Sequence, residues 1–170
     1  AYCDSRKYPQ RNNSINSIMS IQAMYRQQPL TEAKVKRPAD IEIIPLNFDA
    51  KEVRPVMSRD TLDLHYDKLA KGYAKRYNHN EGNPEFNYAG AFLHNTYFPQ
   101  FRKVRDNNKP NGPMKGFIEK HFGTYEVFQK EVEFKAMAIE GSGWVYLASD
   151  GKVKTIENHE VRDDILLLID

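Results

Sequence analysis

The chain has 170 residues, of which 40% are hydrophobic and 12% aromatic, enough to bury a sizeable core in one compact domain with an appendage. Its apolar runs, such as residues 165–169, are far shorter than the roughly 20 residues of a membrane span, and residues 1–14 lack the apolar core of a secretory signal. The single cysteine, Cys3, excludes an internal disulfide framework and a cysteine-based zinc site.

Residues 1–40 are predicted to form a basic N-terminal extension. They carry 7 basic and 3 acidic residues, a net charge of +4, whereas residues 41–170 have a net charge of −2. Such an arm is typical of a segment that contacts nucleic acid or a partner protein, although a solvated leader or a propeptide remnant has the same composition. Within it, the apolar spacing of residues 15–25 indicates a short amphipathic helix.

Residues 41–105 are predicted to form a helical hairpin domain. The first helix begins after Ser58, a suitable N-cap, and ends near residue 78. The second begins near Pro84 and ends before Pro99. Apolar residues of the first helix recur at intervals of three and four: Leu62, Tyr66, Leu69, Tyr73 and Tyr77. Those of the second do the same: Phe86, Gly90, Leu93 and Tyr97.

Residues 106–170 are predicted to form an α/β domain. A turn-rich loop precedes two helices within residues 114–140, which a Phe-Gly pair at 122–123 separates. From residue 144 the apolar period becomes that of strands: two strands flank an Asp-Gly turn, and residues 165–169 form a third strand that we expect to be buried on both faces. Helices followed by a three-stranded antiparallel sheet define an α+β fold.

Two histidines stand beside the apolar stripes of the predicted helices. His65 and His94 each lie one position from a stripe, so both side chains can point toward the seam between the helices. A histidine in such a place is more often a hydrogen-bonded core residue than a metal ligand. Spacing alone therefore does not predict a metal site.

The order of these motifs over residues 41–170 resembles the iron/manganese superoxide dismutase family. LHYDKLAKGYAKRYN resembles the first helix of that family, which implies that His65 is a metal ligand and Tyr73 the gateway tyrosine. FNYAGAFLHNTYF resembles the second-helix motif and implies His94 as the second ligand. The segment from HFGTY to GSGW is similar to the family's and implies Trp144 as an aromatic wall of the site. The strand ILLLID implies that Asp170 is a third ligand.

The resemblance implies an iron or manganese cofactor, since two imidazoles and a carboxylate form a mixed N/O set suited to either metal. In the family the aspartate is followed by Trp-Glu and a histidine ligand, so we expect the α/β domain to be incomplete at its C-terminus and the site to be one ligand short, which leaves metal binding itself open. The family also holds a solvent molecule beside the metal. Ala91 cannot donate to it, and His159, next to Asn158 near the hairpin, is our candidate.

Several positions depart from the family pattern and bear on activity. Leu69 and Ala70 stand where the family usually has histidines, Leu93 replaces an asparagine, and Phe98 replaces a tryptophan. The resemblance implies dismutation of superoxide to peroxide and oxygen if the fourth ligand is present, so the enzyme assignment is open. The alternative is a catalytically inactive, dismutase-fold structural subunit of a large assembly, such as a mitochondrial ribosome or a virion.

The expected partners follow from these two hypotheses. An active protein would act on superoxide, and the resemblance implies a dimer, whereas the alternative implies a place in a larger assembly. The N-terminal arm is expected to contact nucleic acid or protein, and no membrane is expected. We expect an intracellular protein, mitochondrial or cytoplasmic, and the sequence does not choose between them.

Overall fold

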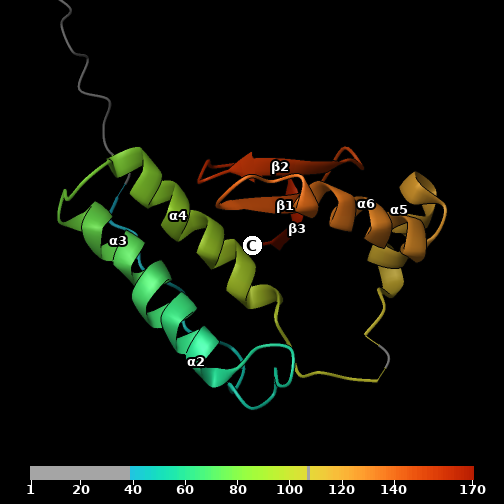
Figure 1. Ribbon diagram of the computed structural model, residues 1–170, viewed down its shortest axis with the longest axis horizontal. Helices are drawn as coiled ribbons and strands as arrows, with labels where there is room; N and C mark the ends of the chain where they lie inside the picture. The colour runs from blue at the N-terminus through green and yellow to red at the C-terminus, as the bar shows by residue number, and fades with distance from the viewer. Residues whose placement is uncertain (1–38, 107) are drawn as a thin grey trace, which may run out of the picture. The chain divides into compact units, whose positions relative to one another are not determined.

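The computed structural model describes residues 39–106 and 108–170 (Figure 1). Most of the basic extension, residues 1–40, lies outside this range, as does the helix expected at residues 15–25. The described residues have helices first and a three-stranded antiparallel sheet last, which confirms the α+β class.

The first predicted helix is continuous but contains a π-helical segment. It comprises α2 (Arg59–Leu62), the π-helix η1 (Asp63–Ala70) and α3 (Lys71–Asn78). The Ser58 hydroxyl accepts a hydrogen bond from the Thr61 N–H at 3.0 Å, which confirms the N-cap. A π turn holds one residue more than an α turn, so the buried stripe moves by one position within η1. Ala70 is fully buried and Leu69 is 50% exposed, so the prediction that Leu69 lies on the buried stripe was wrong.

The second predicted helix is α4 (Pro84–Tyr97), followed by the 3₁₀ turn η2 (Phe98–Gln100). Its N-cap is Asn83, whose side chain accepts from the Phe86 N–H at 3.0 Å. The helix formed by α2, η1 and α3 packs against α4 as a helical hairpin (Figure 1). A Cβ atom at Gly90 would lie only 2.8 Å from Cγ of Tyr73, so glycine permits the close approach of the two helices.

Two further helices, α5 (Gly112–Phe122) and α6 (Tyr125–Met137), follow the turn-rich loop, as predicted. Gly123 separates them with a positive φ of 80°, a conformation that glycine adopts without steric cost. Helix α6 then packs against β1 and β2 of the sheet.

The sheet consists of β1 (Gly143–Ala148), β2 (Val153–Glu157) and β3 (Ile165–Ile169) in the antiparallel order β2-β1-β3. The hairpin prediction is confirmed, and Gly151 in its turn has a φ of +79°. Strand β1 is central and buried on both faces. Among the described strands, β3 pairs with β1 alone, and its Leu166 and Ile169 are 40% and 37% exposed. The prediction that the third strand is buried on both faces was therefore wrong. The apolar run of a single strand does not reveal the order of strands in the sheet, so the edge position of β3 could not be predicted from it.

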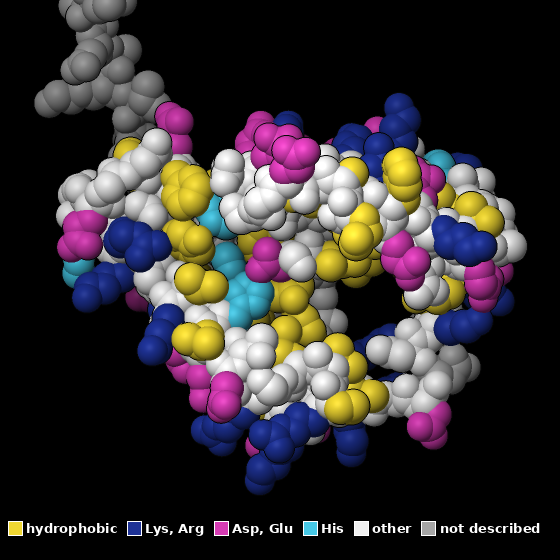
Figure 2. All heavy atoms as spheres, viewed as in Figure 1, with side chains coloured by type: hydrophobic (Ala, Val, Ile, Leu, Met, Phe, Trp, Pro, Cys, Tyr) yellow, Lys and Arg dark blue, Asp and Glu magenta, His cyan; other side chains and the backbone are white. Residues whose placement is uncertain are grey.

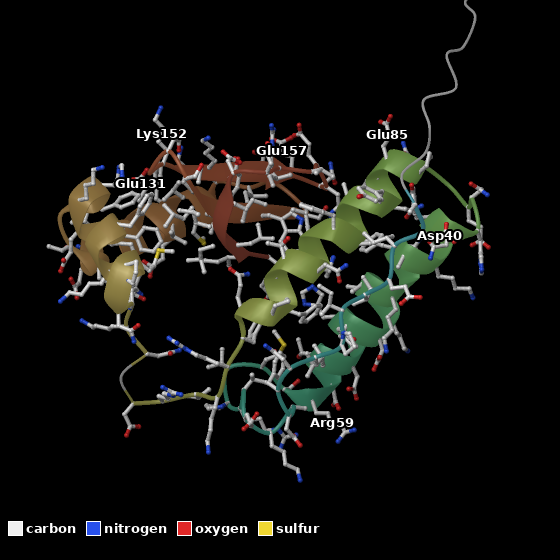
Figure 3. All side chains as sticks on the ribbon, turned by 180° about the vertical axis from the view of Figure 1, so that it is seen from behind. Asp40, Arg59, Glu85, Glu131, Lys152 and Glu157 are labelled. Atoms are coloured by element: carbon white, nitrogen blue, oxygen red, sulfur yellow. The ribbon has the colours of Figure 1, made fainter. Side chains whose placement is uncertain are left out.

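The two faces of the sheet belong to two separate hydrophobic clusters. One lies against α4 and comprises Leu93, Trp144, Tyr146, Ala148, Ile156 and Leu168. The other lies against α5 and α6 and comprises Ile118, Phe128, Val145, Leu147 and Val153. Charged side chains such as Arg59, Glu85 and Lys152 point outward from the elements (Figure 3).

Within residues 39–106 and 108–170, no helix has the length and apolar character needed to cross a membrane. The division of residues 41–170 into a helical hairpin domain and an α/β domain at residue 105 stays a prediction.

Candidate metal centre

Three potential metal ligands from three separate elements meet beside α4. His65 belongs to η1, His94 to α4, and Asp170 follows β3 directly. Nε2 of His65 lies 3.0 Å from Nε2 of His94 and 2.6 Å from Oδ2 of Asp170, and the three donor atoms lie within 4.8 Å of one another. Over the part of the chain that the structure describes, this is the one group of three or more such residues that could hold a metal ion. Figure 2 shows histidine side chains gathered over α4, next to the sheet.

The ring of His65 is held by aromatic neighbours on α4 and η2. Its centroid lies 5.4 Å from that of Tyr97 and 5.2 Å from that of Phe98, and the Phe98 ring is inclined to it by 67°. Pairs at such distances favour edge-to-face geometry. The exposed fraction of the His65 side chain is 13%, so the ring is largely enclosed, with its Nε2 edge facing His94 and Asp170.

The second histidine has a fixed tautomer. Nδ1 of His94 lies 2.6 Å from the carbonyl oxygen of Gly90, one helical turn earlier, and a carbonyl oxygen can only accept a hydrogen bond. Burial lowers the pKa of His94 to about 4, so the ring is neutral near pH 7 and its one proton is on Nδ1. Nε2 therefore presents a free lone pair to His65 and Asp170, which is the state that metal coordination requires.

The cluster is joined by a proton that a cation can replace. Since Nε2 of His94 is an acceptor and the Asp170 carboxylate also accepts, the hydrogen that joins them lies on Nε2 of His65. A metal ion needs lone pairs from all three groups, so this hydrogen would have to leave Nε2, and a neutral His65 would then carry its proton on Nδ1. The 3.0 Å and 2.6 Å distances are hydrogen-bond distances, and a bound cation would take the place of the shared hydrogen.

The donor set fits iron or manganese. Metal–nitrogen and metal–oxygen bonds in protein sites are about 2.0–2.2 Å long, so two donors of one ion lie at most about 4.4 Å apart. The 3.0 Å and 2.6 Å separations satisfy this limit, and the third, between His94 and Asp170, is bounded only at 4.8 Å. Two neutral imidazoles and one carboxylate also match the mixed N/O preference of these metals.

A third histidine lies behind the cluster with a defined proton position. The indole Nε1–H of Trp144 donates to Nδ1 of His159 at 3.1 Å, so the neutral ring carries its proton on Nε2. Burial lowers the pKa of His159, which favours this neutral form. The rings of His159 and His94 lie 6.1 Å apart. The structure therefore brings His159 and Trp144 to the three ligand candidates.

Tyr73 lies between His94 and His159. Its ring centroid is 5.5 Å from that of His94 and 4.7 Å from that of His159. Burial raises the pKa of its phenol, so the hydroxyl keeps its proton at neutral pH. The guanidinium of Arg76 lies 4.9 Å from the Tyr73 ring and is itself held by Asn87, to whose Oδ1 it donates at 3.1 Å.

Sequence reasoning did not single out Tyr97 as part of this surrounding. Its ring contacts His65 and lies 5.7 Å from that of Trp144, and burial, with a smaller contribution from Asp170, raises the pKa of its phenol to about 12. The usable signal was its spacing, because a residue three positions after His94 lies on the same face of a helix.

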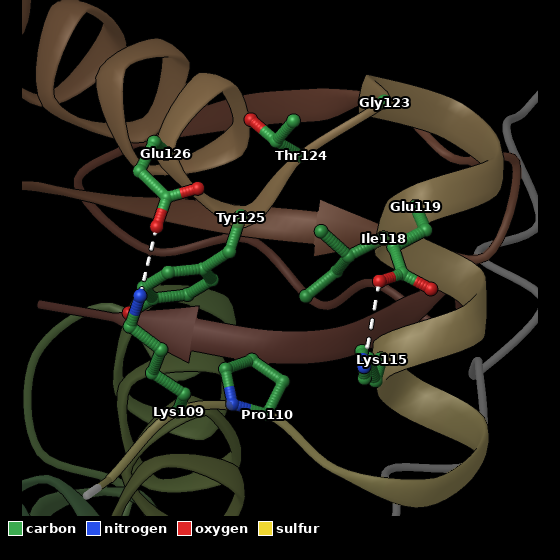
Figure 4. Close-up of a pocket in the computed structure, with 9 residues that line it drawn as sticks. All are labelled: Lys109, Pro110, Lys115, Ile118, Glu119, Gly123, Thr124, Tyr125 and Glu126. Atoms are coloured by element: carbon green, nitrogen blue, oxygen red, sulfur yellow. Dashed lines mark hydrogen bonds and ion pairs between the residues drawn. The ribbon is translucent and has the colours of Figure 1, made fainter.

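Two surface hollows among the described residues touch this group, and the smaller, of about 180 Å³, has Asp170 in its lining. A groove of about 490 Å³ between the start of α4 and the β2–β3 connection has His159 in its lining, with Phe86 and Glu157. The pocket in Figure 4, about 310 Å³, lies instead between the loop before α5 and the start of α6. Ion pairs of Lys109 with Glu126 and of Lys115 with Glu119 line it, and no histidine does, so it is separate from the metal centre.

Comparisons with known proteins agree with this geometry. Residues 110–169 match the family "Iron/manganese superoxide dismutases, C-terminal domain". The chain is 34% identical to a superoxide dismutase [Mn/Fe] of Porphyromonas gingivalis over 132 residues, covering 66% of this chain and 68% of that protein. It is 32% identical to a superoxide dismutase [Fe] of Bacteroides fragilis over 133 residues, 66% of this chain and 69% of that protein.

Proposed function

Because the chain belongs to the iron/manganese superoxide dismutase family, we propose that it binds one iron or manganese ion through His65, His94 and Asp170 and dismutates superoxide to peroxide and oxygen. The observation that carries the proposal is the meeting of three donor atoms within 4.8 Å, with the His94 lone pair already directed at the other two. Fold maintenance alone does not require this arrangement.

The bound ion would supply one-electron exchange between its 2+ and 3+ states, so that two superoxide radicals and two protons give one oxygen molecule and one hydrogen peroxide molecule. The residues of this chain would hold the donors and limit access of water. Trp144 and Phe98 are 1% and 2% exposed and enclose the histidines on the side of the core.

Two further side chains are suited to proton management. The Nε2–H of His159 is a hydrogen-bond donor that can hold a solvent molecule beside the cluster, because Trp144 occupies the other ring nitrogen. Burial keeps the Tyr73 hydroxyl protonated, and its ring lies 4.7 Å from that of His159, so we infer that it donates a hydrogen bond to the incoming anion. Both roles deliver protons where peroxide formation consumes them.

Superoxide decay is the direct test of this function. The chain is loaded separately with manganese and with iron, and superoxide decay is followed by pulse radiolysis. We expect catalytic decay with at least one metal, and its loss in Asp170→Asn. The matched control is Asp67→Asn, an exposed aspartate of η1 that pairs with Lys71. No catalysis by the fully loaded wild type would contradict the proposal.

The alternative of an inactive structural subunit gains no support from the comparisons, whose matched relatives are named as superoxide dismutases. Dimer formation, contacts of the N-terminal arm with nucleic acid or protein, and the compartment stay predictions.

A further inference from the structure

The side chain of Gln100, the last residue of η2, forms hydrogen bonds with the backbone of β3. Its Oε1 accepts from the Leu168 N–H at 2.9 Å, and its Nε2 donates to the Leu168 carbonyl oxygen at 3.2 Å. We propose that Gln100 is a positioning residue that fixes the Asp170 carboxylate against the two histidines. This inference rests on the proposed function, because it concerns the same metal site.

The side chain of Gln100 forms hydrogen bonds with the outer edge of β3, where a neighbouring strand would otherwise pair. Leu168 lies opposite Tyr146 in the β1–β3 ladder, and β3 is an edge strand of the described sheet. The N–H and C=O of an edge residue that face away from the ladder need other partners. The primary amide of Gln100 supplies one acceptor and one donor, the same pair that a backbone neighbour would supply.

The orientation of the Gln100 amide is determined by a third contact. Its Nε2 also donates to the carbonyl oxygen of Tyr97 at 3.1 Å. Since both carbonyl oxygens can only accept, the nitrogen must face Tyr97 and Leu168, and the oxygen must face the Leu168 N–H. A flipped amide would oppose acceptor to acceptor twice and donor to donor once. Gln100 therefore has a single orientation that satisfies all three hydrogen bonds.

These hydrogen bonds connect the segment that carries His94 to the strand that leads to Asp170. Tyr97 is three residues after His94 and Gln100 six, whereas Leu168 is two residues before Asp170. Beyond Leu168 the ladder has one further pair, Val145 with Ile169. The amide thus anchors β3 next to its end, where a small displacement would move the carboxylate away from Nε2 of His65, now 2.6 Å away.

The test uses Gln100→Met, which keeps the length and approximate volume of the side chain but removes its hydrogen bonds. The matched control is Gln129→Met, because Gln129 is an exposed residue of α6 whose side chain donates to exposed Glu133 at 3.3 Å. Mn²⁺ affinity is measured by titrating the metal-free proteins, and the electron paramagnetic resonance spectrum of bound Mn²⁺ is recorded. Loss of a residue that orients a ligand weakens metal binding about 10- to 100-fold.

We expect that loss of affinity and an altered Mn²⁺ spectrum in Gln100→Met, and neither change in Gln129→Met. A merely structural role of Gln100 would lower the stability of the metal-free protein but leave the affinity and spectrum of the folded protein unchanged, which would overturn the inference alone. If the wild type itself bound no Mn²⁺, the proposed function would fail together with it.

Discussion

The two faces of the sheet show how one alternating strand pattern serves two purposes. On the α4 face, Trp144 of β1 contacts two histidines and donates a hydrogen bond to one of them. On the other face, Val145 and Leu147 pack with Phe128 in a cluster without any titratable side chain among its fully buried members. A groove of about 660 Å³ runs along that second face, lined largely by apolar residues of α5, α6 and β3.

The comparison shows which feature distinguishes the face with the candidate metal ligands from the face that only packs. Both faces are apolar at β1, so hydrophobicity does not distinguish them. They differ in the covering helix, because α4 brings a buried histidine with a fixed tautomer, whereas α6 brings Phe128 and Val132. We expect substitutions on the α4 face to alter stability and metal binding together, and those on the α6 face to alter stability alone.

The largest effect is expected for Trp144→Ala. Trp144 is 1% exposed, and removing a buried aromatic side chain costs about 3–5 kcal/mol of unfolding free energy. The change also removes the donor to His159, so metal content should fall as well. Chemical denaturation and elemental analysis of the same sample measure both effects. A destabilised protein with full metal content would contradict the coupling on this face.

Phe128→Ala is the counterpart on the α6 face. Phe128 is 4% exposed, so we expect a loss of about 3 kcal/mol, at the lower end for buried aromatic residues because the adjacent groove lets neighbours and water relax into the space. Metal stoichiometry of the folded protein should equal that of the wild type. A proportionate loss of metal at 25 °C, where the variant is still folded, would break the distinction between the two faces.

A matched pair of glycine-to-alanine substitutions is expected to change the stability by less, and the two substitutions are expected to act in opposite directions. In Gly90→Ala the new methyl group meets the Tyr73 ring at 2.8 Å, and overpacking of about 1–3 kcal/mol exceeds the gain in helix propensity of about 1 kcal/mol. We expect a net loss of about 1 kcal/mol.

Gly116→Ala on α5 is the control, because nothing lies within 4 Å of its added Cβ. It should stabilise the protein by about 0.5–1 kcal/mol through helix propensity alone. Thermal unfolding of both variants measures the difference, and stabilisation by both would mean that Tyr73 is not closely packed against α4.

The smallest effect concerns the ion pair between Lys154 of β2 and Asp164, which directly precedes β3. Lys154 donates to Asp164 at 2.8 Å, and this hydrogen bond lowers the pKa of the Asp164 carboxyl below its usual 3.8. A carboxyl with a lowered folded-state pKa stabilises the fold above about pH 3.8, and this contribution is lost as the pH falls through the folded-state value.

Lys154→Met should therefore lessen the loss of stability below that pH, with little change in metal content at pH 7. Urea denaturation at pH 7, 4 and 3 measures the slope. Because Lys154 also pairs with Asp150 at 3.1 Å, an unchanged acid slope would show that neither pair contributes.

Much of the fold followed from local sequence signals. Ser58 caps the first helix, Pro84 stands in the first turn of α4, Gly123 separates α5 from α6, and the Asp-Gly turn closes the β-hairpin. The π-helical turn could not be predicted, because apolar residues stand at both 69 and 70 and either satisfies the spacing. The edge position of β3 depends on strand order, which the apolar period of a single strand does not encode.

The candidate site was predictable in part. The two histidines beside the helix stripes indicated a shared seam, and the resemblance to the family supplied the remaining residues. The hydrogen bonds of Gln100 were not predictable, because its two partners on Leu168 are backbone groups 68 residues away and leave no trace in residue type.

The most direct test of the account is the metal content of the folded protein after loading with manganese, determined by elemental mass spectrometry for the wild type and for His94→Ala. Alanine has no donor atom, so the variant keeps only two of the three proposed ligands. We predict close to one ion per wild-type chain and almost none in the variant. Equal metal content in the two proteins would contradict the assignment of the site.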